Sequence, residues 1–176
     1  KKSLEILEKA LGKEHPDTAY SYNIVGLSLR DLGRYEEALE YNKKALETRE
    51  KVLGEDHLDT STSYKDVGGS LDDLGRHEEA LEYNKKALEI REKVLGKDHL
   101  STAMSYSSVG TSLVGLGHYE EALEYNKKSL EIYEKVLGKD HPDSGATYSE
   151  VGVSLMHLGR HKEALEYNKK ALEVYE

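Results

Sequence analysis

Four histidines recur at one position of the sequence, and they are the first residues whose chemistry needs a decision. His15, His57, His99 and His141 are 42 residues apart, and three of them follow an aspartate. Histidine and carboxylate side chains bind metal ions, but the ligands of one ion must lie about 2 Å from it. Copies of a repeated residue are separated by at least one helix-packing distance, roughly 10 Å. We therefore interpret the histidines as turn residues that bond to local backbone, and we expect no metal site.

Other groups that carry catalysis are also missing from the sequence. It contains no cysteine and no glycine-rich phosphate loop, and its carboxylates are spread at regular intervals. General acid–base catalysis needs an enclosed pair of groups with shifted pKa values. The sequence therefore predicts a protein that is not an enzyme and that needs no cofactor.

Composition and charge exclude further classes. The formal net charge is −9, and the only regular basic pairs, Lys43–Lys44 and its copies, are surrounded by glutamates. Nucleic-acid-binding proteins normally carry a basic stripe, so a nucleic-acid partner is not expected. No stretch of about 18 apolar residues indicates a membrane span. The lack of cysteine suits a reducing compartment, and we expect a cytoplasmic location.

A 42-residue repeat organises the whole chain. The string LGRYEEALEYNKKALE begins at Leu32 and returns, nearly unchanged, at Leu74, Leu116 and Leu158. A fixed period of this length is typical of solenoids, in which each unit buries its apolar face by stacking on its neighbours. We treat residues 1–176 as a single repeat array. Residues 1–16 are the end of a preceding second helix and a turn, followed by repeats 17–58, 59–100, 101–142 and 143–176.

Each repeat is predicted to hold two helices. In the first repeat, Tyr22, Val25, Leu29 and Leu32 form one apolar stripe over residues 17–32, which we name helix A. Asp17 is the expected N-cap, because a short acceptor side chain can bond a free amide of the first turn. Residues 35–53 carry a second apolar stripe and form helix B. The short connection between them forces an antiparallel hairpin, and the predicted fold class is all-α.

Two residues of the hairpin recur in all four repeats and need a structural explanation. Gly26 and its copies stand in the middle of helix A, where glycine costs about 1 kcal/mol relative to alanine. We expect Ala38 and its copies to face these glycines at a close approach of the two backbones. Tyr41 and its copies form an aromatic row on helix B, which is either a second binding face or, as we favour, part of the packing.

The spacing of these residues resembles that of the tetratricopeptide repeat. The positions concerned are Tyr22, Val25, Gly26, Leu29, Gly33, Tyr35, Ala38 and Ala45. The stretch ALEIREKVLGKDHLSTA (residues 87–103) is similar to the longer repeats of kinesin light chains and related scaffold proteins. The resemblance implies a right-handed superhelix, an α-solenoid whose concave face is lined by helix A and binds peptides of partner proteins. Kinesin light-chain repeats tend to carry two adjacent asparagines in helix A, just after the first packing residue. Only Asn23 matches this pair here, so we do not expect this chain to recognise the same cargo peptides.

The copies differ from one another mainly along one stripe of helix A. In the first repeat the varying residues have the spacing i, i+3, i+4, i+7, i+10 and i+11, rotated away from the packing stripe. We predict that these positions form a partner-binding groove, although neutral drift at exposed positions gives the same pattern. The predicted groove residues are Tyr20, Asn23, Ile24, Leu27, Arg30 and Asp31; Thr62, Lys65, Asp66, Gly69, Asp72 and Asp73; Met104, Ser107, Ser108, Thr111 and Val114; and Ser149, Glu150, Val153, Met156 and His157.

Two functions follow from this pattern. The groove runs from mixed, through acidic, to apolar and polar side chains, which suits a protein or peptide segment with a basic portion and an apolar anchor. The alternative is a structural array. The sequence begins inside a helix B and stops at Glu176 without a polar capping helix, so we expect a piece of a longer protein whose open ends could stack head to tail.

Overall fold

The computed structural model describes the backbone of residues 2–176 and the side chains of residues 6–176. The chain divides into two compact units, Lys1–Ile90 and Arg91–Glu176. The described residues form helices joined by short turns, and no strand occurs among them. The helices are α1 (Lys2–Leu11), α2 (Pro16–Asp31), α3 (Tyr35–Leu53), α4 (Leu58–Asp73), α5 (His77–Leu95), α6 (Leu100–Gly115), α7 (Tyr119–Leu137), α8 (Pro142–His157) and α9 (His161–Tyr175).

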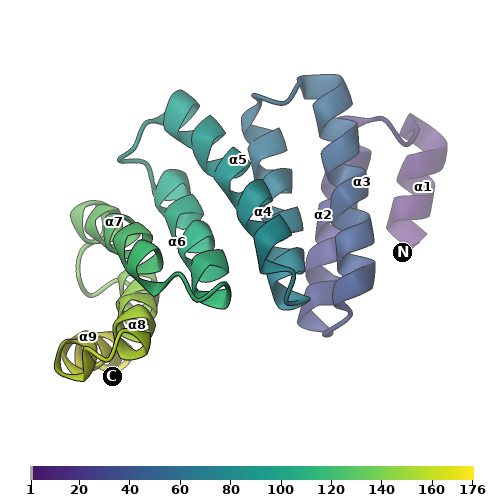
Figure 1. Cartoon of the computed structure of the whole chain (residues 1–176). Helices are drawn as coiled ribbons and strands as arrows, with labels where there is room; N and C mark the ends of the chain where they lie inside the picture. The colour runs from purple at the N-terminus through teal and green to yellow at the C-terminus, as the bar shows by residue number, and fades with distance from the viewer. Residues whose placement is uncertain (1) are drawn as a thin grey trace. The chain divides into compact units, whose positions relative to one another are not determined.

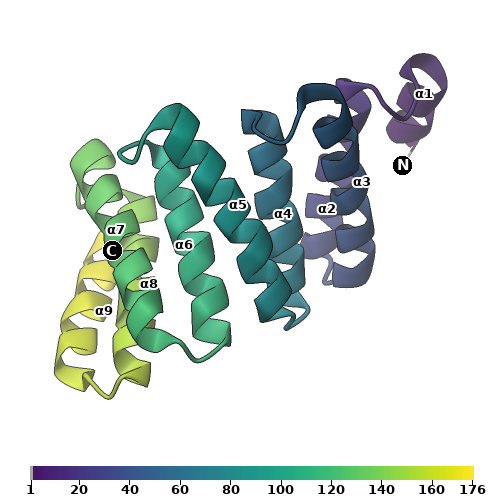
Figure 2. The same cartoon turned by 45° about the horizontal axis from the view of Figure 1, so that its top comes forward.

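The helices pair as the repeat predicted. Helix A of each repeat is α2, α4, α6 or α8, and helix B is α3, α5, α7 or α9 (Figure 1). In the first unit, α2 packs against α3 and α3 packs against α4. In the second unit, α6, α7, α8 and α9 follow the same order (Figure 2). The predicted all-α fold of antiparallel helix hairpins is therefore confirmed.

The turn before each helix A is organised by its histidine. His15 has extended backbone angles and is the N-cap of α2, and its Nδ1 accepts a hydrogen bond from the Asp17 amide at 3.2 Å. His57, His99 and His141 cap α4, α6 and α8 in the same way. The interpretation of these histidines as turn residues is confirmed. The prediction that Asp17 is the N-cap was wrong, because Pro16 already begins the helix, where its lack of an amide hydrogen has no cost.

The core follows the predicted apolar stripes with one exception. Tyr22 and Leu29 are buried, and Val25 packs as a half-buried side chain against the cluster of Tyr22 and Ala45. Leu32, by contrast, is 69% exposed, although its copy Leu74 packs against a buried cluster that includes Leu39 of the preceding helix B. The helix that precedes α2 is α1, whose ten residues supply no counterpart of Leu39. Among the described residues Leu32 thus lacks the contact that Leu74 makes with Leu39.

The glycine in the middle of each helix A makes room for an asparagine of helix B. A Cβ on Gly26 would lie 2.1 Å from Oδ1 of Asn42, and a Cβ on Gly68, Gly110 or Gly152 would lie 2.0–2.3 Å from the corresponding asparagine. The expectation that Ala38 faces Gly26 was therefore wrong, since the three nearest atoms all belong to Asn42. Absence of a side chain on helix A lets a buried amide of helix B lie against its backbone.

Tyrosines join each helix A to both of its neighbours. Tyr22 and Tyr41 of the same hairpin lie with ring centroids 6.2 Å apart, and the other three hairpins repeat this pair. The row on helix B is thus packed, as we favoured, but against helix A of its own repeat. The Tyr22 hydroxyl also donates to Oε1 of Glu8 in the preceding helix at 2.6 Å. The same tyrosine–glutamate bond recurs at Tyr64, Tyr106 and Tyr148.

Within the described part of the chain, no helix combines the length and the apolar character needed to cross a membrane.

Candidate functional site

Most of the predicted groove residues lie at the surface of helix A. We call the side chains at these varying positions the helix A face. On α2, Tyr20, Ile24, Leu27 and Asp31 are exposed, with Tyr20 at 61%, and Arg30 is half-buried. On α4, α6 and α8 the exposed or half-buried members are Thr62, Lys65, Gly69, Asp72, Asp73, Met104, Ser107, Ser108, Thr111, Val114, Ser149, Glu150, Val153, Met156 and His157.

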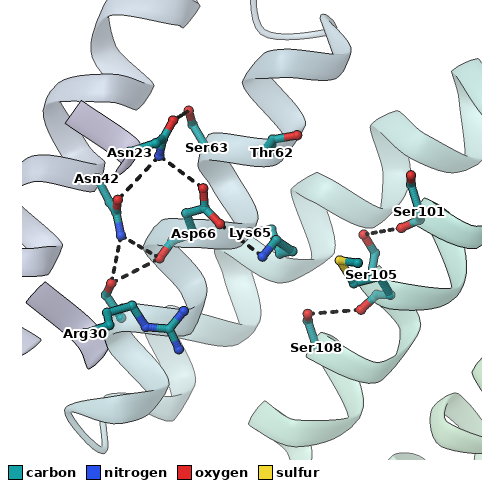
Figure 3. Close-up of polar contacts among 12 residues, drawn as sticks. Asn23, Arg30, Asn42, Thr62, Ser63, Lys65, Asp66, Ser101, Ser105 and Ser108 are labelled. Atoms are coloured by element: carbon teal, nitrogen blue, oxygen red, sulfur yellow. Dashed lines mark hydrogen bonds and ion pairs between the residues drawn. The ribbon is translucent and has the colours of Figure 1, made fainter. Parts of the chain in front are cut away.

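Two predicted groove residues are not on this surface. Asn23 is 5% exposed and Asp66 is 4% exposed. Asn23 Nδ2 donates to Oδ2 of Asp66 at 3.1 Å, and Asn42 Nδ2 donates to the Asp66 carbonyl at 3.2 Å (Figure 3). These bonds join α2, α3 and α4. The prediction that these two positions face a partner was wrong, because helix A of one repeat lies against helix A of the next and covers them.

The acidic character predicted for the second repeat is largely neutralised within the chain. Asp66 pairs with Lys65 at 3.0 Å. Asp73 accepts from Nε of Arg30 on α2 at 2.6 Å. Asp72 lies 3.0 Å from Nδ1 of His77. The α4 carboxylates therefore contact basic groups within the first unit, which reduces the acidic character that they present to a partner.

A buried arginine stands behind the helix A face of the first unit. Arg49 of α3 is 7% exposed, and its Nη1 donates to Ser63 Oγ at 2.7 Å and to the Asp59 carbonyl at 3.1 Å. Burial lowers the pKa of Arg49, while the nearby carboxylates of Asp59 and Asp66 act in the opposite direction. In the second unit, Arg91 occupies the same position and donates to the Ser101 carbonyl and to Ser105 Oγ.

A cavity of about 230 Å³ opens in the second unit, between α6 and α8. Met104, Ser107, Ser108 and Thr111 of α6 line one wall. Asp143, Ala146, Thr147 and Glu150 of α8 line the other, and Tyr133 of α7 also contributes to the lining. The structure thus brings together five predicted groove residues from two repeats: Met104, Ser107, Ser108, Thr111 and Glu150.

The electrostatics of this cavity are set by Glu150. Its carboxylate Oε2 accepts a hydrogen bond from Ser107 Oγ at 2.7 Å. Burial raises the pKa of the Glu150 carboxyl, and the Ser107 bond offsets part of that effect. Burial, together with Asp143 and Glu150, also raises the pKa of Tyr133 to about 12. The cavity therefore holds a partly desolvated carboxyl group beside Asp143, and none of its lining residues is cationic.

The predicted groove set lacks four cavity residues: Tyr133, Asp143, Ala146 and Thr147. We took helix B as nearly invariant, yet the residue at one of its buried positions is arginine at 49 and 91 and tyrosine at 133. That change from a cation to a neutral side chain was the signal that could have located the cavity.

Neither the cavity nor the turns assemble a metal centre. Across the described residues, no three histidine, cysteine or carboxylate side chains come close enough together to hold an ion. His157 instead stacks on Tyr119 with ring centroids 4.4 Å apart.

Comparison with known proteins agrees with the repeat. The family model for the tetratricopeptide repeat matches residues 1–47, 19–93, 67–135 and 113–176. No curated protein sequence matches the chain. Among solved structures, two crystal structures of nearly identical TPR-like repeats, assigned to a kinesin light chain of Podosopora anserina, share 23% identity with TM-scores of 0.81 and 0.78. The alignments cover 97% and 98% of this chain and 81% and 82% of theirs.

Two further structures have the same fold at lower coverage of their own length. BtubC (BKLC) from P. vanneervenii is 20% identical with a TM-score of 0.81, over 92% of this chain and 65% of that one. The apo form of RapI is 23% identical with a TM-score of 0.81, over 98% of this chain and 62% of that one. This chain spans less than two thirds of either protein. Because the repeat model matches from residue 1 to residue 176, and the repeats fold as kinesin-light-chain-like helix hairpins, the chain belongs to the tetratricopeptide repeat family.

Proposed function

We propose that this chain is a non-catalytic protein-interaction module that binds a segment of a partner protein along the helix A face of each unit. The observation that carries the proposal is the exposure of apolar side chains at the positions where the repeats differ. On α2 these are Tyr20, Ile24 and Leu27, which the i, i+4, i+7 spacing places on one stripe. On the second unit they are Met104, Val153 and Met156.

The packing beneath the helix A face supports this function. Asn23, Asn42 and Asp66 hold α2, α3 and α4 together through buried hydrogen bonds. The exposed side chains above them are thus carried on rigid helices. A partner segment that docks there orders little of the module, so less of its interaction energy is offset by ordering.

Peptide display against the whole chain tests this function. A variant with Ile24→Ser, Leu27→Ser and Met104→Ser serves for counter-selection, and all three residues are exposed, so the fold should be kept. A matched control replaces exposed valines of helix B, Val52→Ser and Val94→Ser. We expect selected peptides that bind the native chain and the control but not the helix A variant. Peptides indifferent to all five changes, or no peptides, would contradict the proposal.

A structural array is the second candidate, and a specific observation favours it. Leu165 and Leu172 of α9 are 56% and 58% exposed, whereas Leu123 and Leu130, their copies in α7, are each 6% exposed under α8. In α7 this face is covered by the next helix A, α8. The same face of α9 is exposed. A second copy of this chain that supplied such a helix would make a head-to-tail contact that need not close.

Sedimentation velocity over a concentration series tests the stacking of this chain. Growth in mass with concentration, abolished in a Leu165→Ser/Leu172→Ser variant, would support stacking. A constant monomer mass at all concentrations would rule it out for this chain.

A further inference from the structure

The cavity between α6 and α8 occurs at a place that is filled by a cation elsewhere in the same protein. Tyr133 of α7 aligns with Arg49 of α3 and Arg91 of α5. Arg49 and Arg91 each reach into the adjacent helix A and bond to a backbone carbonyl and a serine hydroxyl. At α7 this cation is replaced by a phenol, and the cavity appears at that position.

The carboxylates near Arg49 have counterparts at the cavity, although the arginine does not. Asp59 and Asp66 are the carboxylates that act on Arg49, and they align with Asp143 and Glu150. At the α5–α6 contact, where Arg91 lies, the same positions are serines. Asp143 and Glu150 both line the cavity, and none of its nine lining residues is cationic. In the first unit Arg49 lies near the two acids, whereas no cation lines this cavity. The basic groups around it are His141, whose Nδ1 is 3.7 Å from Oδ2 of Asp143, and Arg91, which acts on Tyr133.

The neutral side chains of the cavity offer mostly hydrogen-bond acceptors. Ser107 donates its hydroxyl proton to Glu150, Ser108 to the Met104 carbonyl, Thr111 to the Ser107 carbonyl and Thr147 to the Asp143 carbonyl. Each hydroxyl oxygen keeps lone pairs that can accept a bond. Apart from the Tyr133 hydroxyl, the cavity thus offers acceptors for a ligand that donates hydrogen bonds, and it disfavours an anionic ligand.

We infer that this cavity binds a lysine side chain of the partner segment, with the ammonium on Glu150 and the methylene stem against Met104 and Ala146. The inference rests on the proposed function. Lysine is favoured over arginine because a bidentate guanidinium would have to share Oε2 of Glu150 with the Ser107 hydroxyl, whereas an ammonium can bond Oε1 alone. An ammonium is a compact charge with three donors and can bond one carboxylate oxygen and the neighbouring hydroxyls.

Nuclear magnetic resonance with small probes tests the cavity directly. The methyl groups of Met104 and Ala146 in the labelled whole chain are observed during titration with Nα-acetyl-lysine methylamide and, separately, the norleucine analogue, which has the same stem without the charge. We expect saturable shifts with the lysine probe and at least about tenfold weaker effects with norleucine. Equal shifts from both probes, or none from lysine, would overturn the inference.

Three variants locate the response. Glu150→Gln should weaken the lysine probe about tenfold, because the isosteric amide keeps the shape and removes the charge. Tyr133→Arg should abolish binding by restoring the internal cation. Glu120→Gln, an exposed glutamate of α7, is the matched control and should change nothing. Unaltered lysine binding in both Glu150→Gln and Tyr133→Arg would refute the assignment.

The two proposals fail in different ways. If the helix A face binds peptides but the cavity takes no lysine, the selected peptides keep their affinity when each lysine is replaced by norleucine, and only this inference falls. If display yields no peptide that depends on helix A, while the lysine probe binds as expected, the proposed function falls and the cavity assignment stands.

Discussion

Substitution of Gly68 by alanine tests whether helix propensity or tertiary packing has the larger effect on stability at this position. Gly68 lies in the middle of α4, where alanine is favoured over glycine by about 1 kcal/mol. From the sequence alone, Gly68→Ala should therefore stabilise the protein. The structure predicts the opposite sign, because the new Cβ would lie 2.3 Å from Oδ1 of Asn84 and 2.7 Å from its Cγ.

The size of the effect follows from what Asn84 must give up. Ordinary contact begins near 3.4 Å, so the amide must retreat by about 1 Å. Overpacking of this kind costs about 1–3 kcal/mol. Moving the amide also breaks its 3.3 Å bond to Oδ2 of Asp72, worth about 1.5–3 kcal/mol with a charged acceptor. After the gain in helix propensity, we expect a net loss of about 2–4 kcal/mol in the free energy of unfolding.

Urea and thermal unfolding followed by circular dichroism measure this loss, and at roughly 2–4 °C per kcal/mol the midpoint should fall by about 5–15 °C. Gly69→Ala is the matched control on the same helix. The nearest atom to its new Cβ is Nη1 of Arg30 at 3.0 Å, the end of a flexible side chain. This variant should be neutral or gain up to about 1 kcal/mol.

A double-mutant cycle with Asn84→Ala isolates the contact. In that background the obstructing amide is absent, so Gly68→Ala should become stabilising, and the coupling should exceed about 2 kcal/mol. Stabilisation by Gly68→Ala in the native background would refute the reasoning, as would equal effects at Gly68 and Gly69.

Two further predictions concern the bonds that join neighbouring helices and begin helix A. Burial and the hydrogen bond to Glu50 raise the pKa of Tyr64, so its contribution is complete below about pH 10 and is lost as the pH rises toward the folded-state value. Tyr64→Phe should therefore destabilise the protein more at pH 8 than at pH 11 in urea titrations, because at pH 11 part of the contribution has been lost. Tyr20→Phe, at an exposed site, should change neither value, and an equal loss from Tyr64→Phe at both pH values would contradict this. His57→Ala should lower the free energy of unfolding by about 1 kcal/mol and speed amide exchange in the first turn of α4, because the cap is lost. His118→Ala removes a histidine that makes no side-chain cap bond, and a loss as large as that of His57→Ala would contradict the capping role.

The sequence predicted the helices well because their signals are local. The apolar spacing and the glycines near residues 33 and 54 lie within one repeat, and they placed helix B at the residues where α3 begins and ends. The positive φ of Gly33, 71°, and of Gly54, 89°, agrees with the predicted helix ends. The role of the turn histidines was also predictable, because their partner is a backbone amide two residues away.

Predictions about which side chains meet across helices were less accurate. Asn23 and Asp66 vary between repeats as exposed residues do, yet they bond to each other from helices that are 43 residues apart along the chain. The sequence also suggested Ala38 as the neighbour of Gly26, whereas the structure places Asn42 there. Both errors concern the relative rotation and depth of packed helices, which the periodicity of a single helix does not specify.

The cavity that Glu150 lines also shows which features the sequence determined and which depend on the tertiary structure. The repeat itself determined the all-α hairpin fold, the helix boundaries and the stripe of variation on helix A, because each depends on residues close in sequence. Only the tertiary structure decided which varying residues are buried, which carboxylates already have a cation, and that Tyr133 leaves Asp143 and Glu150 without one. These properties depend on side chains brought together from separate repeats, and they follow from how closely the helices pack.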